Sequence, residues 1–176
     1  MNKTYLLIFI VFLGVPSNVI ASYNINIVEI TNPNLKSVLI SKKSETSFYN
    51  DISFRIFQNN CLIGNIYTTF PSKKSINLIS KIQDKFIKAD FGGKTINVKI
   101  KDGFSHVNGS IILIDLGWKY IEDIKKFVEK SPQISLVLKN GEGFNLESYF
   151  NIKFNSWKLN GVREALDKAI KVCEKL

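Results

Sequence analysis

The sequence predicts a mainly β protein of the α+β class, either an antiparallel β-sandwich or a strongly bent sheet. Several short stretches alternate apolar with polar residues and are separated by residues typical of turns, which is the pattern of strands with one buried face. Only two stretches, near residues 119–130 and 161–175, repeat apolar residues at the three- and four-residue steps of a helix. Because strands do not alternate regularly with helices, a parallel α/β sheet is not expected.

The first half of the chain contains four alternating or apolar stretches that we interpret as strands or strand fragments. They lie at residues 22–30, 38–40, 52–57 and 61–68. Residues 41–47 are polar and predict a loop, and Asn59-Asn60 predicts a turn that joins the last two strands. Cys61 is therefore expected at the start of a strand, directly after a hairpin turn.

The middle of the chain contains the clearest hairpin signal. Gly92-Gly93 suits the positive φ angles of a tight turn and separates two alternating stretches, residues 86–91 and 94–101. Asp102-Gly103 predicts a further turn, and residues 110–115 form an apolar run typical of a buried strand. Residues 75–86 fit both a helical stripe and a short strand, and periodicity alone does not decide between them.

The last third contains both predicted helices. Ser131-Pro132 ends the first, because the residue before a proline avoids the helical conformation. Residues 134–138 are a predicted strand, and residues 144–154 alternate in part and are predicted as another. Asn160 is the expected N-cap of the terminal helix, whose apolar stripe includes Cys173.

The first 21 residues have the pattern of a signal peptide, followed by a single domain over residues 22–176. Lys3 precedes an uncharged apolar run, residues 6–13, and residues that break helices follow it. Val19 and Ala21 occupy the −3 and −1 positions of a cleavage site, so we expect cleavage between Ala21 and Ser22. The apolar run is too short for a transmembrane helix, which needs about 20 residues. No membrane-spanning segment is expected after cleavage, and the predicted localisation is periplasmic or secreted.

Export changes the interpretation of the two cysteines. Cys61 and Cys173 would meet an oxidising compartment, where a pair of cysteines usually forms a disulfide. They lack the Cys-x-x-Cys spacing of redox-active pairs, so we expect a structural bond that ties the terminal helix to the sheet. One histidine and two cysteines are also too few for a zinc site built from four Cys or His ligands. Neither a metal nor a cofactor is expected.

The chain is basic, with a formal net charge of +9, and the positive charge is concentrated in one segment. Residues 71–101 hold eight lysines and only two acidic residues. The candidate basic patch in this segment consists of Lys85, Lys88, Lys99 and Lys101. Such a patch attracts anionic lipid, polysaccharide or a protein partner. The chain has 22 lysines but only two arginines, the residue that specific nucleic-acid readers favour, so no nucleic acid is expected as a partner.

No catalytic constellation stands out in the sequence. His106 lies between Ser105 and Ser110, but adjacent Ser and His residues in a turn cannot face each other as nucleophile and base. Four aspartates lie near turns and strand ends, and their spacing selects no pair for glycosidase chemistry. They are Asp84, Asp90, Asp102 and Asp115. Gly92-Gly93-Lys94 lacks the strand–loop–helix context of a phosphate-binding loop.

The C-terminal third carries a family resemblance. Residues 121–173 contain a helix, a strand, and then the sequence FNSWKLNGVREALDKA followed by Cys173. This section resembles the end of the invasion-associated locus B family of secreted or periplasmic bacterial proteins, and it is similar to the end of small periplasmic proteins that include type VI secretion accessory proteins. The resemblance implies a β-sandwich and an exported bacterial protein, and it carries over no catalytic residues.

We therefore expect an exported bacterial protein that acts by binding and is not an enzyme. Its expected partner is a protein, an envelope component or an anionic surface, and the resemblance implies an association with invasion or virulence. Two alternatives stay open: a secretion-system accessory factor, and a small secreted hydrolase that uses carboxylates.

Overall fold

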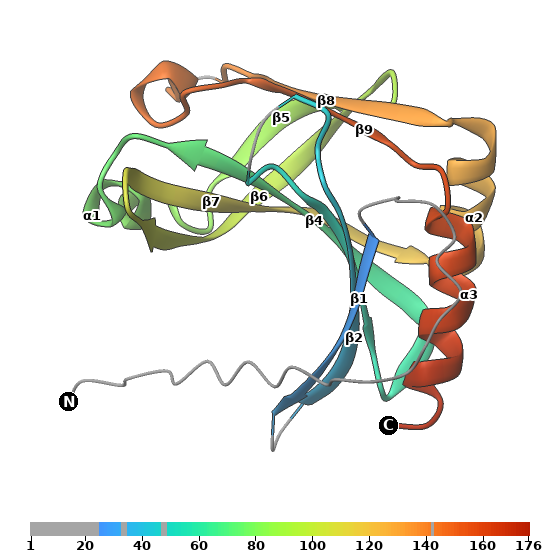
Figure 1. The fold of residues 1–176 in the computed structure, drawn as a ribbon. Helices are drawn as coiled ribbons and strands as arrows, with labels where there is room; N and C mark the ends of the chain where they lie inside the picture. Colours follow the sequence, from blue (N-terminus) through green and yellow to red (C-terminus); the bar gives the residue numbers. More distant parts are fainter. Residues whose placement is uncertain (1–24, 33–34, 47–48, 142) are drawn as a thin grey trace.

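The computed structural model describes residues 25–32, 35–46, 49–141 and 143–176. The predicted signal peptide, its cleavage site between Ala21 and Ser22, and the start of the first predicted strand lie outside these residues. Within these residues, nine strands form a single antiparallel sheet in the order β1-β2-β3-β4-β7-β6-β5-β8-β9 (Figure 1). Their bounds are β1 Ile25–Asn32, β2 Leu35–Lys42, β3 Ile52–Phe57, β4 Asn60–Ser72, β5 Phe86–Phe91, β6 Lys94–His106, β7 Gly109–Tyr120, β8 Gln133–Lys139 and β9 Phe154–Lys158.

The sheet bends until its last strands lie opposite its middle ones. In Figure 1, β8 and β9 cross above β4 and β7. The segment between β2 and β3 then meets the edge strand β9: the Glu45 amide donates to the Ser156 carbonyl at 3.0 Å, and the Trp157 indole donates to the Asn50 carbonyl at 2.7 Å. These bonds nearly close the sheet on itself. The predicted mainly β fold is confirmed, and of its two predicted forms the structure has the bent sheet.

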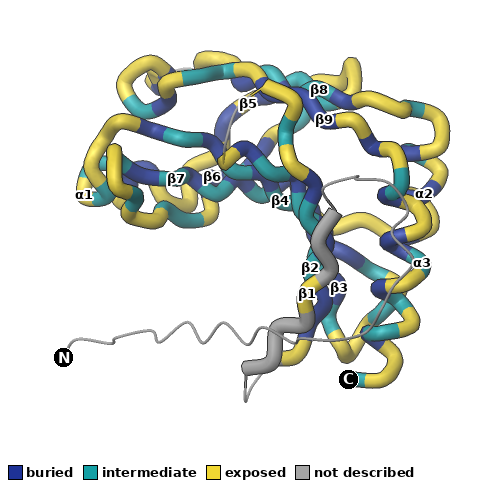
Figure 2. The backbone as a smooth tube through the Cα atoms, viewed as in Figure 1, coloured by how far each residue is buried: buried dark blue, intermediate teal, exposed yellow. Residues whose placement is uncertain are grey.

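The hydrophobic core fills the inside of the bend. Strand β3 alternates fully buried residues with half-buried ones, and Figure 2 shows the same alternation along other strands. Ile56, Ile114 and Trp157 are completely buried. Each large apolar side chain that leaves water in this way contributes about 1.5–3 kcal/mol. We call the side of the sheet that faces this core the inner face, and the other side the outer face.

Two helices cover one end of the bent sheet. Helix α2 spans Ile121–Lys130 and helix α3 spans Val162–Cys173, and they pack against each other. Lys125 on α2 is mostly buried and pairs with Glu122 at 2.8 Å and with Asp167 on α3 at 2.6 Å. Among the described residues, no helix has the length and apolar character needed to cross a membrane.

The disulfide predicted from export is present. Cys61 near the start of β4 is bonded to Cys173 in the last turn of α3, with the two Cα atoms 5.9 Å apart. The bond fixes the end of the chain to the sheet, as the sequence predicts.

Several local predictions are wrong at strand and helix ends. Asp102-Gly103 is not a turn: β6 continues through both residues to His106, with a bulge that absorbs one extra residue between Ile100 and Asp102. The strand of residues 38–40 is longer, Leu35–Lys42, and so takes in the first two residues of the predicted loop.

The remaining corrections concern the last third and the ambiguous middle segment. Residues 144–154 are not a continuous strand; they hold the short 3-10 helix η2, Leu146–Ser148, and only then the start of β9. The N-cap of α3 is Gly161, with φ 78°, and not Asn160. The segment that fitted both a helix and a strand forms two short helical turns, α1 Ile76–Ile79 and η1 Ser80–Ile82.

Candidate functional site

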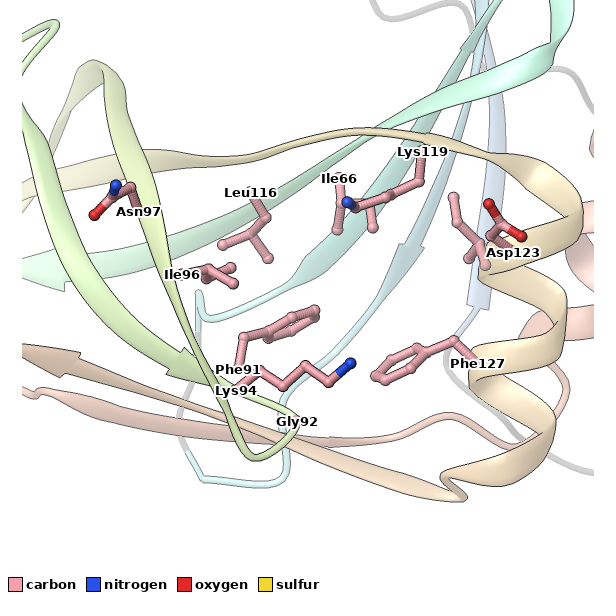
Figure 3. A pocket seen from close by; sticks show the side chains of 11 residues that line it. Ile66, Phe91, Gly92, Lys94, Ile96, Asn97, Leu116, Lys119, Asp123 and Phe127 are labelled. Carbon is pink, nitrogen blue, oxygen red and sulfur yellow. The ribbon is translucent and has the colours of Figure 1, made fainter.

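A cavity of about 430 Å³ lies between the turn of the β5–β6 hairpin, strands β4 and β7, and helix α2 (Figure 3). We call it the α2 cleft. Its walls are mainly apolar and consist of Ile66, Phe91, Ile96, Leu116, Ile124 and Phe127. Its polar side chains are Lys94, Asn97, Lys119 and Asp123. Small-molecule sites typically have a volume of about 300–1,000 Å³ and combine apolar walls with a few polar groups, and the α2 cleft has both properties.

The Gly92-Gly93 turn lets the β5–β6 hairpin approach α2 closely. Both glycines have positive φ angles, 57° and 80°, which side chains with a Cβ rarely adopt. A Cβ on Gly92 would lie 3.2 Å from the Phe127 ring, so glycine also provides the space for contact. Phe91 stacks on Phe127 with 5.9 Å between ring centroids and 29° between planes. The stacked rings form the wall of the cleft where the hairpin meets the helix.

A bulge in β7 aims Lys119 into the cleft. Ile112 and Ile114 are buried on the inner face, so a regular strand would place every odd-numbered residue, including Lys119, on the outer face. Tyr67 pairs with Asp115 but Ile66 pairs with Gly117, which leaves Leu116 as the extra residue. Beyond the bulge the alternation is therefore inverted.

Two contacts confirm this inversion. Lys119 is paired with Gly64, and a Cβ on Gly64 would lie 2.8 Å from the Ile121 side chain of α2, so this position faces the helix. Trp118 correspondingly points to the outer face, where its ring lies 5.2 Å from that of Phe57. The bulge depends on Gly117, whose φ of 94° is unfavourable for other residues.

The cleft holds two ammonium groups that form no ion pair in the described part of the chain. Figure 3 shows Lys94 directed toward Phe127, and Lys119 directed back across the cleft toward Ile66. Within the described part of the chain, neither lysine nor Asp123 makes a side-chain hydrogen bond or ion pair. Two lysines and one aspartate give the lining a formal charge of +1. A cation beside apolar walls is stabilised by any anion that enters.

The structure places the four lysines of the candidate basic patch elsewhere, on and around the outer face of the β5–β6 hairpin. Lys85 precedes β5 and is exposed, and Lys88 is exposed in β5. Lys99 pairs with Asp84 at 2.7 Å, and Lys101 is the exposed bulge residue of β6. The hydrogen bond and the charge of Lys99 lower the pKa of Asp84 below its ordinary 3.8. Whether this patch binds an anionic surface stays a prediction.

An outer groove of about 450 Å³ adjoins the patch. Arg55, Tyr67, Lys101, Asp102 and Phe104 contribute side chains to it. Asp115 lies close by on the same face, where it accepts hydrogen bonds from the Asn65 side chain at 3.3 Å and the Gly117 amide at 2.7 Å. Burial, followed by the charge of Asp115, raises the pKa of Tyr67.

The other aspartates considered for catalysis are held in ion pairs. Asp84 pairs with Lys99, and Asp90 pairs with Lys139 on β8 at 2.5 Å. The hydrogen bond from Lys139 lowers the pKa of Asp90 below 3.8. The sheet thus separates the four aspartates by role: two neutralise lysines, and Asp102 and Asp115 lie on the outer face of neighbouring strands.

His106 does not meet a serine in catalytic geometry. It is the last residue of β6, opposite Gly109, and its ring lies 4.5 Å from that of Tyr49 in an edge-on contact. The Ser110 hydroxyl donates instead to the Lys74 carbonyl at 2.8 Å. Among the described residues, no group of three or more His, Cys, Asp or Glu side chains forms a site for a metal ion.

Comparisons with known protein families, with curated proteins and with solved structures each find no match for this chain. The resemblance of residues 121–173 to the invasion-associated locus B family stays a prediction. The candidate site therefore rests on its own geometry.

Sequence reasoning missed the α2 cleft. The signal available was Gly117, a glycine between an apolar run and a helix, which is typical of a bulge. It does not reveal that the inverted alternation brings Lys119 into the same cleft as Lys94, since the two residues come from different strands.

Proposed function

We propose that this protein is an exported bacterial binding protein that holds a small molecule in the α2 cleft and does not act as an enzyme. The observation that carries the proposal is the α2 cleft itself, an apolar cavity with two unpaired ammonium groups aimed into it. Export follows from the predicted signal peptide, and the Cys61–Cys173 bond is in keeping with an oxidising compartment.

The walls of the cleft favour binding. Ile66, Leu116 and Ile124 are all less than 10% exposed and belong to the core, so the cleft is an opening into a rigid, well-packed region. Affinity for an apolar ligand comes from removing its surface from water, at about 25 cal/mol per Å². A preformed cavity adds to affinity because few groups must be ordered on binding.

The test measures binding of the neutral fluorescent probe N-phenyl-1-naphthylamine to the protein purified from Ser22 onward. We expect saturable binding, and we expect the bulky substitution Ile96→Trp to abolish it because the indole fills the cleft. Ile111→Trp is the matched control, since Ile111 is half-buried on β7 outside the cleft. Absence of saturable binding to the unsubstituted protein, or equal binding by both variants, would contradict the proposal.

A separate test addresses the proposal that the protein is not an enzyme. A broad hydrolase screen of the same protein should give no turnover beyond that of a mock purification. Reproducible turnover that Asp102→Asn or Asp115→Asn abolishes would favour the carboxylate-dependent hydrolase and overturn this part of the proposal.

A further inference from the structure

We propose that the ligand of the α2 cleft is a single-chain aliphatic carboxylate, with its acidic group attracted by the lysines of the lining, Lys94 and Lys119, and its chain along the apolar wall. This inference rests on the proposed function, since it names the class of molecule that the same cleft holds. It follows from three features: the shape of the aromatic wall, the origin of the two lysines and the position of Asp123.

The aromatic wall favours a flexible chain over a flat ring. Phe91 and Phe127 contact each other directly, at a centroid distance within the usual range for an aromatic pair. No ring can therefore insert between them, and together they present one continuous surface. The rest of the lining is branched aliphatic, from Ile66, Ile96 and Leu116. An alkyl chain adapts to such a surface by rotating its single bonds.

The two lysines approach the cleft from separate strands. Lys94 begins β6 and Lys119 lies near the end of β7, and Figure 3 shows their ammonium groups on different sides of the cleft, so an anion in the cleft would meet positive charge from two strands. An ammonium offers three donors and no acceptor, and a carboxylate offers two acceptor oxygens and no donor. A carboxylate thus complements the positive charge of the lysines, whereas an alcohol has one oxygen and brings no charge.

Asp123 should affect anion binding in the opposite direction to the two lysines. It lines the same cleft from the first turn of α2 and has no ion-pair partner among the described residues. Its negative charge repels a bound carboxylate. Removing this charge should strengthen binding of an anion and leave binding of a neutral analogue unchanged.

The experiment compares decanoate with decan-1-ol, which share a chain and differ in the head group, as competitors of N-phenyl-1-naphthylamine at neutral pH and low salt. We expect decanoate to bind about tenfold more tightly than the alcohol, the size of one charge-assisted hydrogen bond. Lys94→Met and Lys119→Met should each weaken decanoate about two- to fivefold, because both lysines are exposed, with no effect on the alcohol. Asp123→Asn should tighten decanoate about two- to threefold, a small effect because the group is exposed.

The control variant is Lys126→Met. Lys126 is exposed on α2 and lies outside the cleft lining, so this variant removes a nearby charge without changing the site. It should behave as the unsubstituted protein does. Equal affinity for decanoate and decan-1-ol would overturn the anion inference and leave the proposed function standing, and so would equal effects of Lys119→Met and Lys126→Met. If the probe binds and Ile96→Trp abolishes its binding, but neither decanoate nor decan-1-ol displaces it, the aliphatic class of the ligand would be overturned and the proposed function would stand. Failure of the probe to bind would overturn the proposed function itself.

Discussion

The α2 cleft and the basic patch share the β5–β6 hairpin, yet they surround their lysines differently. In the patch, Lys99 is neutralised by Asp84, and the neighbouring Lys139 is neutralised by Asp90. In the cleft, Lys94 and Lys119 lie beside apolar walls and have no carboxylate partner in the described part of the chain.

The difference shows that charge density along the sequence does not locate the lysines most available to a ligand. Ions in water screen exposed charges over about 10 Å at 0.1 M salt, and Lys94 and Lys119 are exposed, as most of the patch lysines are. A ligand that lies on the apolar wall would displace water from one side of such a lysine. A lysine in the cleft therefore acts at short range on a single bound molecule. The patch acts instead through the summed field of many lysines, and this suits a large anionic surface.

The largest expected effect comes from removing the disulfide, and it should separate the two regions. The loop closed by Cys61 and Cys173 spans 112 residues, for which the chain-entropy model gives about 4–5 kcal/mol. Because the stabilisation measured for disulfides is often smaller than this model gives, we expect the double variant Cys61→Ala/Cys173→Ala to lose about 3 kcal/mol of unfolding free energy in urea. Helix α3 holds α2 through Lys125–Asp167 and Arg163–Glu129, so the cleft should lose affinity for the neutral probe as well.

The patch lies on the β5–β6 hairpin and does not depend on α3. Binding of the double variant to dextran sulfate should therefore match that of the unsubstituted protein at temperatures where both are folded. A loss of dextran sulfate binding together with probe binding would show that the two regions are not independent. Unchanged unfolding free energy would contradict the stabilising role of the bond.

A smaller effect is expected from Gly117→Ala, which tests whether the bulge creates the difference between the two regions. A Cβ at φ 94° strains the backbone by about 1–3 kcal/mol, and relief of that strain would shift the pairing that aims Lys119 inward. We expect decanoate to lose its advantage over decan-1-ol, measured by probe displacement. Gly143→Ala is the matched control, because Gly143 also has a positive φ, 69°, with open space around it, and it lies outside the cleft lining. The bulge would not be responsible if both variants keep the preference for decanoate.

The bulge in β7 also separates the features that the sequence predicts from those that it does not. Most of the strands, the hairpin at Gly92-Gly93 and the disulfide follow from patterns a few residues long or from the compartment, and the structure contains them. Such patterns do not reveal which residues of a strand face the core beyond a bulge. One extra residue, Leu116, moves Lys119 from the outer to the inner face, so a local reading assigns it to the wrong side.

Long-range contacts explain the other differences. Residues 144–154 alternate as a strand would, but the Asn145 side chain accepts the Glu147 amide and starts the turn η2 instead. The bent sheet itself depends on bonds such as Glu45 to Ser156, which join residues more than 100 positions apart. Neither the cleft nor the near closure of the sheet can therefore be derived from periodicity.

The smallest expected effect concerns pH and distinguishes the neutralised lysines from the free ones. The pKa values of Asp84 and Asp90 are lowered by their lysine partners, so both groups stay ionised at neutral pH and protonate only as the pH falls below 3.8. The stabilisation from these pairs is present above that value and is lost as the pH falls through the lowered pKa values. Protonation would also free Lys99 and Lys139, so the affinity of the patch for dextran sulfate should rise at acid pH.

The variant Asp84→Asn/Asp90→Asn should already show this higher affinity at pH 7, by about two- to fivefold at low salt, because it removes both negative charges permanently. Glu147→Gln is the matched control: the pKa of Glu147 is likewise lowered by a lysine, Lys153, but the pair lies outside the patch.

Substituting Glu for Lys85, Lys88, Lys99 and Lys101 should abolish the salt-sensitive binding altogether. Binding to the α2 cleft should be unchanged in all three variants, since its two lysines have no carboxylate partner to lose in the described part of the chain. If Asp84→Asn/Asp90→Asn and Glu147→Gln bind dextran sulfate equally, the field of the patch is not set by its carboxylates, and the contrast with the cleft rests on apolar surroundings alone.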